Sequence, residues 1–231
     1  RSHLHLTAGA RRVIVTAPDR RADLMVVMGI NHTDYDTRRH KVVSNASCTT
    51  NCLAPIAKVL HDELGIKTGL MTTIHAYTGS QLVLDHAGSD PRRSRSAATN
   101  IVPTSTGAAR AVAEVIPDLQ GRLNGCAYRV PIPTVSIAEL CCHVQRPADA
   151  AEVNAAFKQA SDEGMLKGIL GYSELPLVSS DFRGTTHSSV LDARSTMCSG
   201  ELVKVAAWYD NEWGYACRVA ELAAFITEQG L

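Results

Sequence analysis

The chain has 231 residues, of which 45% are hydrophobic and 20% charged, and these proportions are typical of a folded globular protein rather than a disordered or fibrous one. Its 23 basic residues balance 23 acidic ones, which argues against nucleic acid or an anionic membrane face as the main partner. No apolar run approaches the roughly 18 residues of a membrane-spanning helix.

Three short apolar runs open the chain and predict buried strands at 12–18, 24–30 and 41–44. Hydrophobic and polar residues do not alternate along these runs, and this is typical of strands in a parallel sheet that is covered on both faces. The links between them are too short for the crossover helices of such a sheet, and there is neither an initiator methionine nor a signal-peptide pattern. We therefore expect residues 1–46 to be the end of an α/β domain that begins before this sequence. The alternative is a small edge subdomain.

A helix is predicted over 48–64, where apolar residues recur at intervals of three and four and Gly65 supplies a C-terminal stop. Pro55 should kink or tighten this helix, because proline lacks a backbone donor. A strand is predicted over 67–75. Residues 78–98 are polar and rich in Gly, Ser, Asp and Arg, and a loop of that length in a compact domain is usually functional or disordered.

The rest of the chain mixes strands and helices. Strands that follow one another directly, with helices inserted, predict an α+β domain with a mostly antiparallel sheet. Asp149 and Glu152 resemble a capping box, and turn signals at Gly184 and Gly200 indicate hairpins. The predicted helices are 108–116, 149–160 and 216–229, and the predicted strands are 127–130, 134–144, 177–182, 188–192 and 202–208.

Cys48 is the strongest candidate for chemistry, because it falls where a strand end runs into a helix start. Free N–H groups and the helix dipole at that position stabilise an anion, which should lower the pKa of the thiol. Ser47 and Thr49 add hydroxyl donors on either side. Most cysteines are simply small buried hydrophobic residues, and we expect Cys52, one turn further on, to be one of these.

A nucleophilic cysteine needs a base, and His75 is the best candidate among the nine histidines. It ends a predicted strand directly before the long loop, where active-site residues tend to collect. The seven cysteines are scattered and odd in number, which favours a reduced, cytoplasmic protein, and we expect no metal site.

Five ordered motifs together resemble the phosphorylating glyceraldehyde-3-phosphate dehydrogenase family. They are SNASCTTNC at 44–52, HAYT at 75–78, PTSTGAA at 103–109, GCAYRVP at 125–131 and WYDNE at 208–212. The nonapeptide around Cys48 is highly specific, and the similarity covers essentially the whole chain.

The resemblance implies three parts. Residues 1–46 are expected to be the C-terminal remnant of a Rossmann-type dinucleotide-binding domain, 47–211 the α+β catalytic domain, and 212–231 a helix that packs on the nucleotide domain. No G-x-G-x-x-G motif follows a strand in this sequence, so we expect weak binding of NAD or NADP, aggregation and negligible turnover by the chain as written. The apolar face of the last helix, with Val219, Leu222 and Ile226, should then be exposed.

The family also implies a role for each matched residue. Cys48 attacks the aldehyde of glyceraldehyde 3-phosphate, and His75 acts as base while hydride leaves for the nicotinamide of NAD or NADP. Inorganic phosphate cleaves the resulting thioester to give 1,3-bisphosphoglycerate, and Asn211 holds the nicotinamide carboxamide. The family assembles as a homotetramer. The phosphate-binding residues are Thr78 and Arg129 for the substrate's own phosphate, and Ser47, Thr49, Thr106 and Gly107 for the attacking phosphate.

Two departures from the family pattern lie in and near the long loop. Ser80 stands where the family usually has Asp, so a carboxylate beside the substrate site is lost and affinity or inhibitor profile should differ. The segment Asp85-His86-Ala87 stands where many NAD-specific members carry Leu-Pro, and small or polar residues there resemble members that accept NADP. Arg92 to Arg95 form a basic cluster on the same loop, which in the family reaches the cofactor of a neighbouring subunit.

Three alternatives stay open. One is an erythrose-4-phosphate dehydrogenase, although such a hydrolytic relative has no need of the phosphate-attack motif at Thr106 and Gly107. Another is a catalytically silent binding or regulatory fragment. A plain Cys-His hydrolase would explain Cys48 and His75, but neither Asn211 nor the two phosphate sites.

Overall fold

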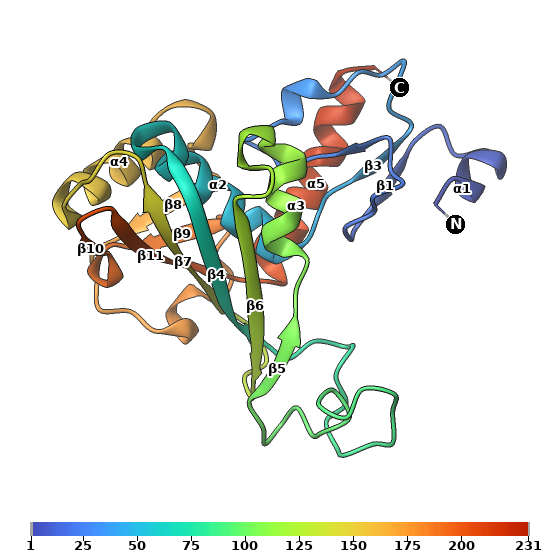
Figure 1. Ribbon diagram of the computed structural model, residues 1–231. Coiled ribbons are helices and arrows are strands. Elements are labelled where there is room, and N and C mark those ends of the chain that lie inside the picture. The colour runs from blue at the N-terminus through green and yellow to red at the C-terminus, as the bar shows by residue number, and fades with distance from the viewer. Residues whose placement is uncertain (1, 231) are drawn as a thin grey trace.

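The computed structural model describes residues 2–230, which form a small parallel sheet and a large mixed sheet with helices (Figure 1). The small sheet has the strand order β1-β3-β2, and both of its pairings are parallel, as predicted for the start of the chain. Its strands are β1 (Val13–Val15), β2 (Leu24–Met25) and β3 (Val42–Ser44), accompanied by the helix α1 (Leu4–Thr7) and the 3-10 turn η1 (His32–Asp34).

The second strand is much shorter than the apolar run at 24–30 predicted. Beyond β2 the chain makes a buried turn in which Gly29 has a φ of +80°. The side chain of Asn31 holds this turn, because it accepts a hydrogen bond from the Val27 N–H and donates one to the Met25 carbonyl, both at 2.9 Å. A continuous apolar run is thus a short strand followed by a turn, and hydrophobicity alone cannot separate the two.

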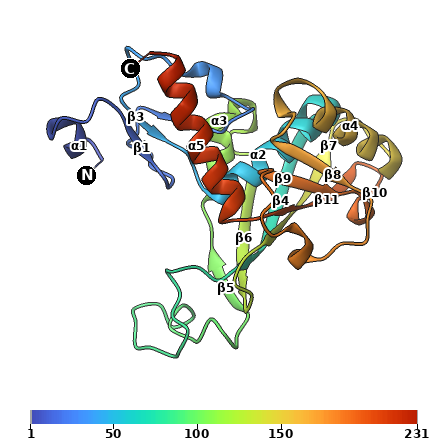
Figure 2. The same cartoon turned by 180° about the vertical axis from the view of Figure 1, so that it is seen from behind.

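The C-terminal helix α5 (Trp213–Glu228) lies beside the small sheet (Figure 2). Leu222 and Ile226 are 0% and 3% exposed, so the expectation that this face is exposed is wrong. Burying each side chain stabilises the fold by roughly 1.5–3 kcal/mol. The apolar cluster that α5 forms with the first part of the chain consists of Val26, Tyr35, Val43, Leu222 and Ile226.

The large sheet has eight strands, in the order β5-β6-β4-β7-β11-β9-β8 with β10 paired to β11. Among the strands of residues 2–230, β4 with β6 and β8 with β9 pair in parallel, and the other pairs of this sheet are antiparallel. The predicted α+β class with a mostly antiparallel sheet is confirmed. The strands are β4 (Ile66–Ala76), β5 (Val102–Ser105), β6 (Leu123–Val130), β7 (Ser136–Val144), β8 (Leu170–Ser173), β9 (Ser189–Asp192), β10 (Met197–Ser199) and β11 (Leu202–Tyr209).

Three helices pack on the large sheet and bury one continuous apolar core against it: α2 (Cys48–Leu64), α3 (Ala108–Val115) and α4 (Ala150–Asp162). The central helix, α2, contacts β4, β7, β9 and β11 and packs against both other helices. It begins at the predicted residue and ends at Gly65, whose φ of +70° suits a residue without a Cβ. No helix within the described part of the chain is long and apolar enough to cross a membrane.

The segment 177–182 is not the predicted strand. Ser179–Phe182 form a 3-10 turn, η4, which opens with a 2.8 Å hydrogen bond from the Val178 N–H to the Asp181 carboxylate. The other 3-10 turns are η2 (Pro117–Leu119), η3 (Gly164–Leu166) and η5 (Ala193–Ser195).

Two turn predictions have different outcomes. The turn at Gly200 closes the antiparallel hairpin of β10 and β11, as expected. Gly184 closes no hairpin, because the strand before β9 is β8, which pairs with it in parallel.

The edge strand β5 was not predicted, since it contains Pro103, and a strand accepts proline only at an edge or a bulge.

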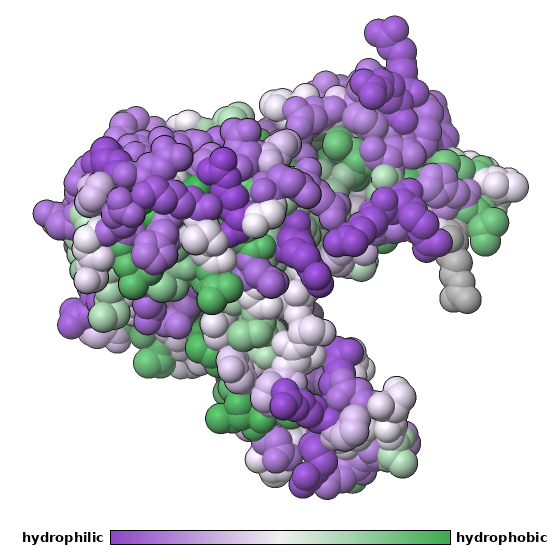
Figure 3. Space-filling view, in the orientation of Figure 1, coloured by the Kyte–Doolittle hydropathy of each residue, from purple (hydrophilic) through white to green (hydrophobic). Residues whose placement is uncertain are grey.

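The loop predicted over 78–98 is confirmed, since residues 77–101 contain neither helix nor strand. It projects away from the rest of the molecule, and polar and apolar side chains mix on its surface (Figure 3). Asp85 organises the loop, because its carboxylate accepts a hydrogen bond from the Ser96 N–H at 2.7 Å and pairs with Arg95 at 3.2 Å.

Candidate active site

Cys48 is the first residue of α2, directly after the turn that leaves β3. Ser47 caps the helix, and its hydroxyl accepts a hydrogen bond from the Thr50 N–H at 3.0 Å. Ala46 has a φ of 55°, a left-handed conformation that costs a residue with a Cβ roughly 1–2 kcal/mol. The sharp turn leaves the side chain of Cys48 half-buried at the start of a helix that is otherwise mostly buried.

His75 lies near the end of β4, on the side of the sheet that α2 covers. Met71, Thr73 and His75 are buried and alternate along the strand with more exposed residues. This alternation places Nε2 of His75 3.5 Å from Sγ of Cys48. The cysteine and the histidine that the sequence analysis singled out are therefore in contact.

The other ring nitrogen of His75 faces two groups at once. Nδ1 lies 2.6 Å from the carbonyl oxygen of Ala76 and 2.7 Å from Nη1 of Arg129. Arg129 also donates to the Ala76 carbonyl at 3.0 Å. It reaches this position because β6 pairs in parallel with β4 in a register that sets Arg129 opposite His75.

Burial determines the protonation of the pair. It raises the pKa of Cys48 above the ordinary 9.0, and hydrogen bonds from Thr49 and the charge of Arg129 oppose this rise only in part. Burial, and after it the charge of Arg129, lowers the pKa of His75 from 6.5 to about 4. The expected lowering of the thiol pKa is therefore wrong for the free site, because desolvation outweighs the helix N-terminus. Both shifts favour a thiol beside a neutral imidazole in the free site.

Tyr209, the last residue of β11, connects the helix of Cys48 with the strand of His75. Its hydroxyl lies 2.9 Å from Oγ1 of Thr49 and 2.8 Å from Oγ1 of Thr73. Its ring meets the imidazole of His75 edge-on, with the ring centres 5.9 Å apart. The imidazole is thus held between an aromatic ring and a guanidinium group, which limits its rotation.

A chain of hydrogen bonds leads from the strand of His75 to Asn211. The Ala76 N–H donates to Oγ of Ser136 at 3.0 Å, and the hydroxyl of Ser136 donates to Oδ1 of Asn211 at 2.9 Å. The neighbouring Asp210 accepts hydrogen bonds from two backbone N–H groups at the start of α5. Asn211 therefore has a fixed place between β7 and α5.

Buried polar atoms without a hydrogen-bond partner occur around this centre. Within residues 2–230 they include Oδ1 of Asn51, one turn after Cys48, and Nε of Arg129. Others lie elsewhere, such as Oε1 of Gln81 in the long loop and Nε of Arg218 in α5. Such atoms are rare, because each unsatisfied group costs roughly 1–3 kcal/mol. Their presence here is typical of a site that binds a polar ligand.

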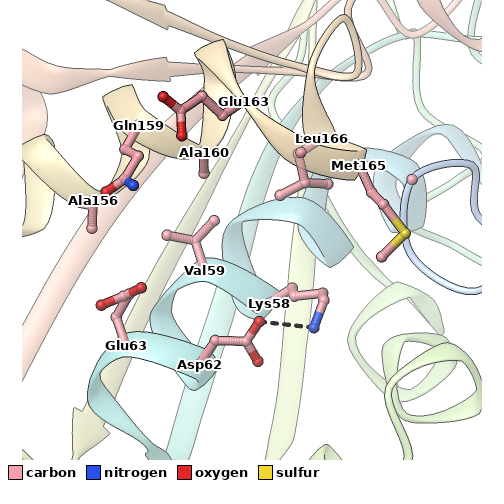
Figure 4. A pocket seen from close by; sticks show the side chains of 12 residues that line it. Lys58, Val59, Asp62, Glu63, Ala156, Gln159, Ala160, Glu163, Met165 and Leu166 are labelled. Carbon is pink, nitrogen blue, oxygen red and sulfur yellow. Dashed lines mark hydrogen bonds and ion pairs between the residues drawn. The ribbon is translucent and has the colours of Figure 1, made fainter.

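A cavity at the other end of α2 lacks these features. It has a volume of about 340 Å³ and lies between the second half of α2, α4 and η3 (Figure 4). Its walls combine apolar side chains such as Val59 and Leu166 with the ion pair of Lys58 and Asp62, which is 2.8 Å long. None of the site residues predicted from the sequence lines this cavity.

Comparisons with known proteins assign the chain to a family. A profile described as "Glyceraldehyde 3-phosphate dehydrogenase, C-terminal domain" matches residues 47–211. The chain is 58% identical over 228 residues to "Glyceraldehyde-3-phosphate dehydrogenase 1" of Bacillus subtilis, a match that covers 98% of this chain and 68% of the relative. The chain belongs to the glyceraldehyde-3-phosphate dehydrogenase family.

Two further relatives agree with this assignment. "Glyceraldehyde-3-phosphate dehydrogenase 2" of Nostoc is 59% identical over 226 residues, covering 97% of this chain and 67% of the relative. "Glyceraldehyde-3-phosphate dehydrogenase" of Geobacillus stearothermophilus is 56% identical over 228 residues, covering 98% and 68%. The chain thus corresponds to about two thirds of the length of these members of the family.

Several residues that the family resemblance linked to phosphate are already hydrogen-bonded within the protein. The hydroxyl of Thr49 contacts Tyr209, and that of Ser47 caps α2. Oγ1 of Thr78 lies 3.1 Å from Oγ of Ser80, the residue that stands in place of the usual family Asp. To bind a ligand, these hydroxyl groups have to give up hydrogen bonds within the protein and form new ones to the ligand.

Thr106 and Gly107 precede α3. Oγ1 of Thr106 accepts a hydrogen bond from the Ala108 N–H at 3.2 Å. The space beside Gly107 is open, since a Cβ placed on this residue would have no other heavy atom within 4 Å. No hydrogen bond among the described residues joins either one to Cys48. The structure therefore brings Cys48, His75 and Arg129 into one contact network and leaves Thr106 and Gly107 outside it.

Sequence analysis missed Tyr209 and Ser136 as parts of the site. Tyr209 lies inside the motif at 208–212, which could have drawn attention to it, but its contacts depend on strand pairing. β11 and β7 pair with Tyr209 opposite Ser136, so the two residues reach the site from strands more than sixty positions apart. No local pattern carries that information.

Proposed function

We propose that this chain carries the catalytic centre of a phosphorylating glyceraldehyde-3-phosphate dehydrogenase. This oxidoreductase converts glyceraldehyde 3-phosphate and inorganic phosphate to 1,3-bisphosphoglycerate with NAD or NADP. The observation that carries the proposal is the 3.5 Å contact of Cys48 Sγ with His75 Nε2 at the start of α2, in a chain of this family. The family resemblance extends the proposal to a cytoplasmic homotetramer, with 47–211 as the catalytic domain.

The neutral pair sets the order of proton transfers. Sγ of Cys48 attacks the aldehyde carbon while Nε2 of His75 takes the thiol proton and passes it to the aldehyde oxygen. The same nitrogen takes that proton back when the thiohemiacetal loses hydride and becomes a thioester. Phosphate then attacks the thioester carbon, and the acyl phosphate leaves as the sulfur of Cys48 recovers its proton. General acid–base catalysis of this kind contributes roughly 10²–10⁴-fold in rate.

NAD or NADP, when bound, supplies the acceptor for the hydride. Asn211 suits the carboxamide end of such a cofactor, because its amide nitrogen makes one long hydrogen bond, to Glu212 at 3.3 Å, and keeps an N–H for a ligand. The sequence contains no G-x-G-x-x-G motif, so these residues account for the nicotinamide end alone.

The two phosphate groups are assigned to different residues. Arg129 suits the phosphate of the substrate, because it has no carboxylate partner within residues 2–230 and its Nε is buried without a hydrogen bond. The open backbone at Gly107, at the N-terminus of α3, suits the attacking phosphate, since helix N-termini favour anions. The remaining residues of the proposal are Thr78 for the first phosphate, and Ser47, Thr49 and Thr106 for the second.

Acylation by the reaction product tests this function without any cofactor. The chain is mixed with 1,3-bisphosphoglycerate, and peptide mass mapping locates the 3-phosphoglyceroyl group. We expect a thioester on Cys48, slower formation with His75→Asn, and none with Cys48→Ser. An acyl group on another cysteine, or no acyl group at all in the wild-type chain, would contradict the proposal.

A further inference from the structure

The backbone turns sharply between β3 and Cys48, and the central residue of the turn is not a glycine. Ala46 has a φ of 55°, a left-handed conformation that residues with a Cβ rarely adopt, and it is fully buried. The carbonyl oxygens of Asn45, Ala46 and Ser47 each accept a hydrogen bond from a side chain. The strained turn is therefore held by side chains, which come from α2 and α5.

Asn51, near the start of α2, holds the two carbonyl groups that flank Ala46. Its Nδ2 donates to the carbonyl oxygen of Asn45 at 2.9 Å and to that of Ser47 at 3.0 Å. The side chain is 2% exposed, so water does not compete for these hydrogen bonds. Because both acceptors are carbonyl oxygens, only the nitrogen end of the amide can face them. One side chain thus bridges the left-handed residue.

This orientation of the Asn51 amide has a cost. It leaves Oδ1 buried without a hydrogen-bond partner, and such an oxygen destabilises a fold. Asparagine is also a weaker helix former than leucine, whose side chain has the same branched skeleton. Stability of α2 alone therefore does not explain an asparagine at this position, whereas the two hydrogen bonds to the turn do.

Further side chains fix Ala46 itself. The hydroxyl of Tyr215, on α5, donates to the Ala46 carbonyl oxygen at 2.9 Å. The Ala46 N–H donates to Oγ of Ser44 at 3.1 Å, and the hydroxyl of Ser44 donates to the carbonyl oxygen of Ala17 at 2.7 Å. The turn is thus connected to α5 and to the segment that follows β1, while Asn51 holds it from α2.

The conformation of this turn determines where Cys48 lies at the start of α2. Cys48 follows Ala46 by two residues, whereas His75 belongs to β4, so the 3.5 Å contact of Sγ with Nε2 joins two separate elements. If Ala46 left the left-handed region, the chain would enter α2 in another direction and Sγ would move relative to Nε2. A displacement of about 1 Å in a reacting group can slow a reaction roughly 100-fold.

We infer that Asn51 is a positioning residue for the reaction of Cys48. By holding the carbonyl groups on both sides of Ala46, it keeps the turn left-handed and keeps Sγ of Cys48 at the place from which it attacks. Asn51 transfers no proton and touches no substrate in this role. The inference rests on the proposed function, in which Cys48 is the nucleophile. Tyr215 supports the same turn but holds only one carbonyl group, so its contribution is smaller.

Acylation of Cys48 by 1,3-bisphosphoglycerate tests this role. Asn51→Leu keeps the branched shape of the side chain and removes both donors. We expect its maximal acylation rate to fall roughly 10–100-fold. The concentration that gives half of this rate, which depends on Arg129, should stay close to that of the wild type. Circular dichroism and urea unfolding show beforehand that the variant is folded.

Tyr215→Phe is the milder variant and serves if Asn51→Leu does not fold. It removes one donor and leaves the ring in place, so acylation should slow by roughly 2–10-fold, as expected for one neutral hydrogen bond. In that case a wild-type rate in Tyr215→Phe would count against the inference.

A second substitution separates positioning from general stability. Glycine adopts left-handed conformations readily, so Ala46→Gly added to Asn51→Leu should restore most of the lost rate. Ala46→Gly alone gives the reference rate for this comparison. Asn154→Leu is the matched control, because Nδ2 of Asn154 donates to the Ala193 carbonyl oxygen at 2.9 Å from another helix, α4. This control should be acylated at the wild-type rate.

Two results would overturn the inference: a folded Asn51→Leu that is acylated as fast as the wild type, or a slow Asn51→Leu whose rate Ala46→Gly does not restore. Its failure is distinguishable from failure of the proposed function. If the wild type and Asn51→Leu form the Cys48 thioester equally fast, the function stands and the positioning role does not.

If the wild type forms no thioester, the proposed function fails, and crystal structures of the wild type and Asn51→Leu decide the role of Asn51 in holding the turn. That role stands if the φ of Ala46 becomes negative in the variant, and it falls if this angle stays near 55°.

Discussion

The two ends of α2 provide opposite environments on one helix. At the N-terminal end, Cys48 faces His75, and buried polar atoms of Asn51 and Arg129 lack partners. At the other end, a cavity of about 340 Å³ opens beside the ion pair of Lys58 with Asp62 (Figure 4). No residue that lines this cavity has an unpartnered buried polar atom in the described part of the chain.

The difference shows that volume alone does not mark a reactive site. The cavity has room, but its polar groups are exposed or paired, so a ligand gains little by displacing water there. The N-terminal end has coupled groups that compete for hydrogen bonds and a helix end with free N–H groups. Reactivity is expected where hydrogen bonding is incomplete, so substitutions at the two ends of α2 should have very different effects.

The largest effect is expected when the base is removed. His75→Asn should slow acylation of Cys48 by 1,3-bisphosphoglycerate by roughly 10²–10⁴-fold, because asparagine cannot take a proton. Lys58→Met, at the cavity end of the same helix, should leave this rate unchanged. Quenched-flow mass spectrometry of both variants measures the rates. Equal slowing by both substitutions would mean that α2 as a whole, and not the contact of Cys48 with His75, governs the reaction.

The buried imidazole should also make the fold sensitive to acid. The pKa of His75 is about 4 in the folded protein against an ordinary 6.5, so the unfolded chain binds more protons between these values. The stabilisation is complete above pH 6.5 and is lost as the pH falls towards 4, by about 3 kcal/mol in all. Urea unfolding at several pH values should show this slope in the wild type and in the loop variant His86→Asn, but much less in His75→Asn. Parallel pH profiles for the two variants would exclude a buried neutral His75.

Local patterns predicted the helix of Cys48, its stop at Gly65 and the strand of His75, because capping, periodicity and alternation are encoded within a few residues. They could not predict the contact of Arg129 with His75, which depends on the register of β4 with β6. They also misjudged the pKa of Cys48, because the desolvation that raises it comes from elements distant in sequence. The contacts of Tyr209 were missed for the same reason.

A smaller effect separates the two proposed phosphate sites. Arg129→Met should weaken the apparent affinity for 1,3-bisphosphoglycerate by about 10–100-fold, the usual range for a lost charged hydrogen bond of roughly 1.5–3 kcal/mol. Thr106→Ala should instead weaken inorganic phosphate, by about tenfold or less, in the cleavage of the acylated protein. Both constants are measured in both variants. The assignment fails if the two effects are exchanged or are the same.

The smallest effect is expected at the cavity end. The pair of Lys58 with Asp62 is an i,i+4 contact with partly exposed side chains, and such pairs stabilise a helix by about 0.3–0.5 kcal/mol. Lys58→Met should therefore change the free energy of unfolding by no more than about 0.5 kcal/mol, as measured by urea titration at pH 7. A loss above about 2 kcal/mol would show that this end of α2 is far more strongly coupled than its exposure indicates.

Alkylation of the seven cysteines by iodoacetamide, mapped by peptide mass between pH 5 and 10, tests most directly whether Cys48 and His75 form one centre. The half-buried Cys48 should react in the folded chain, and Cys52, fully buried with a pKa raised to about 12, should react only as the chain unfolds. In the free protein the rate at Cys48 should keep rising beyond pH 9, without a step near 6.5, as a thiol beside a neutral imidazole requires. Labelling of Cys52 as fast as that of Cys48 in the folded chain, or a rate at Cys48 that is already constant below pH 7, would contradict this account of the site.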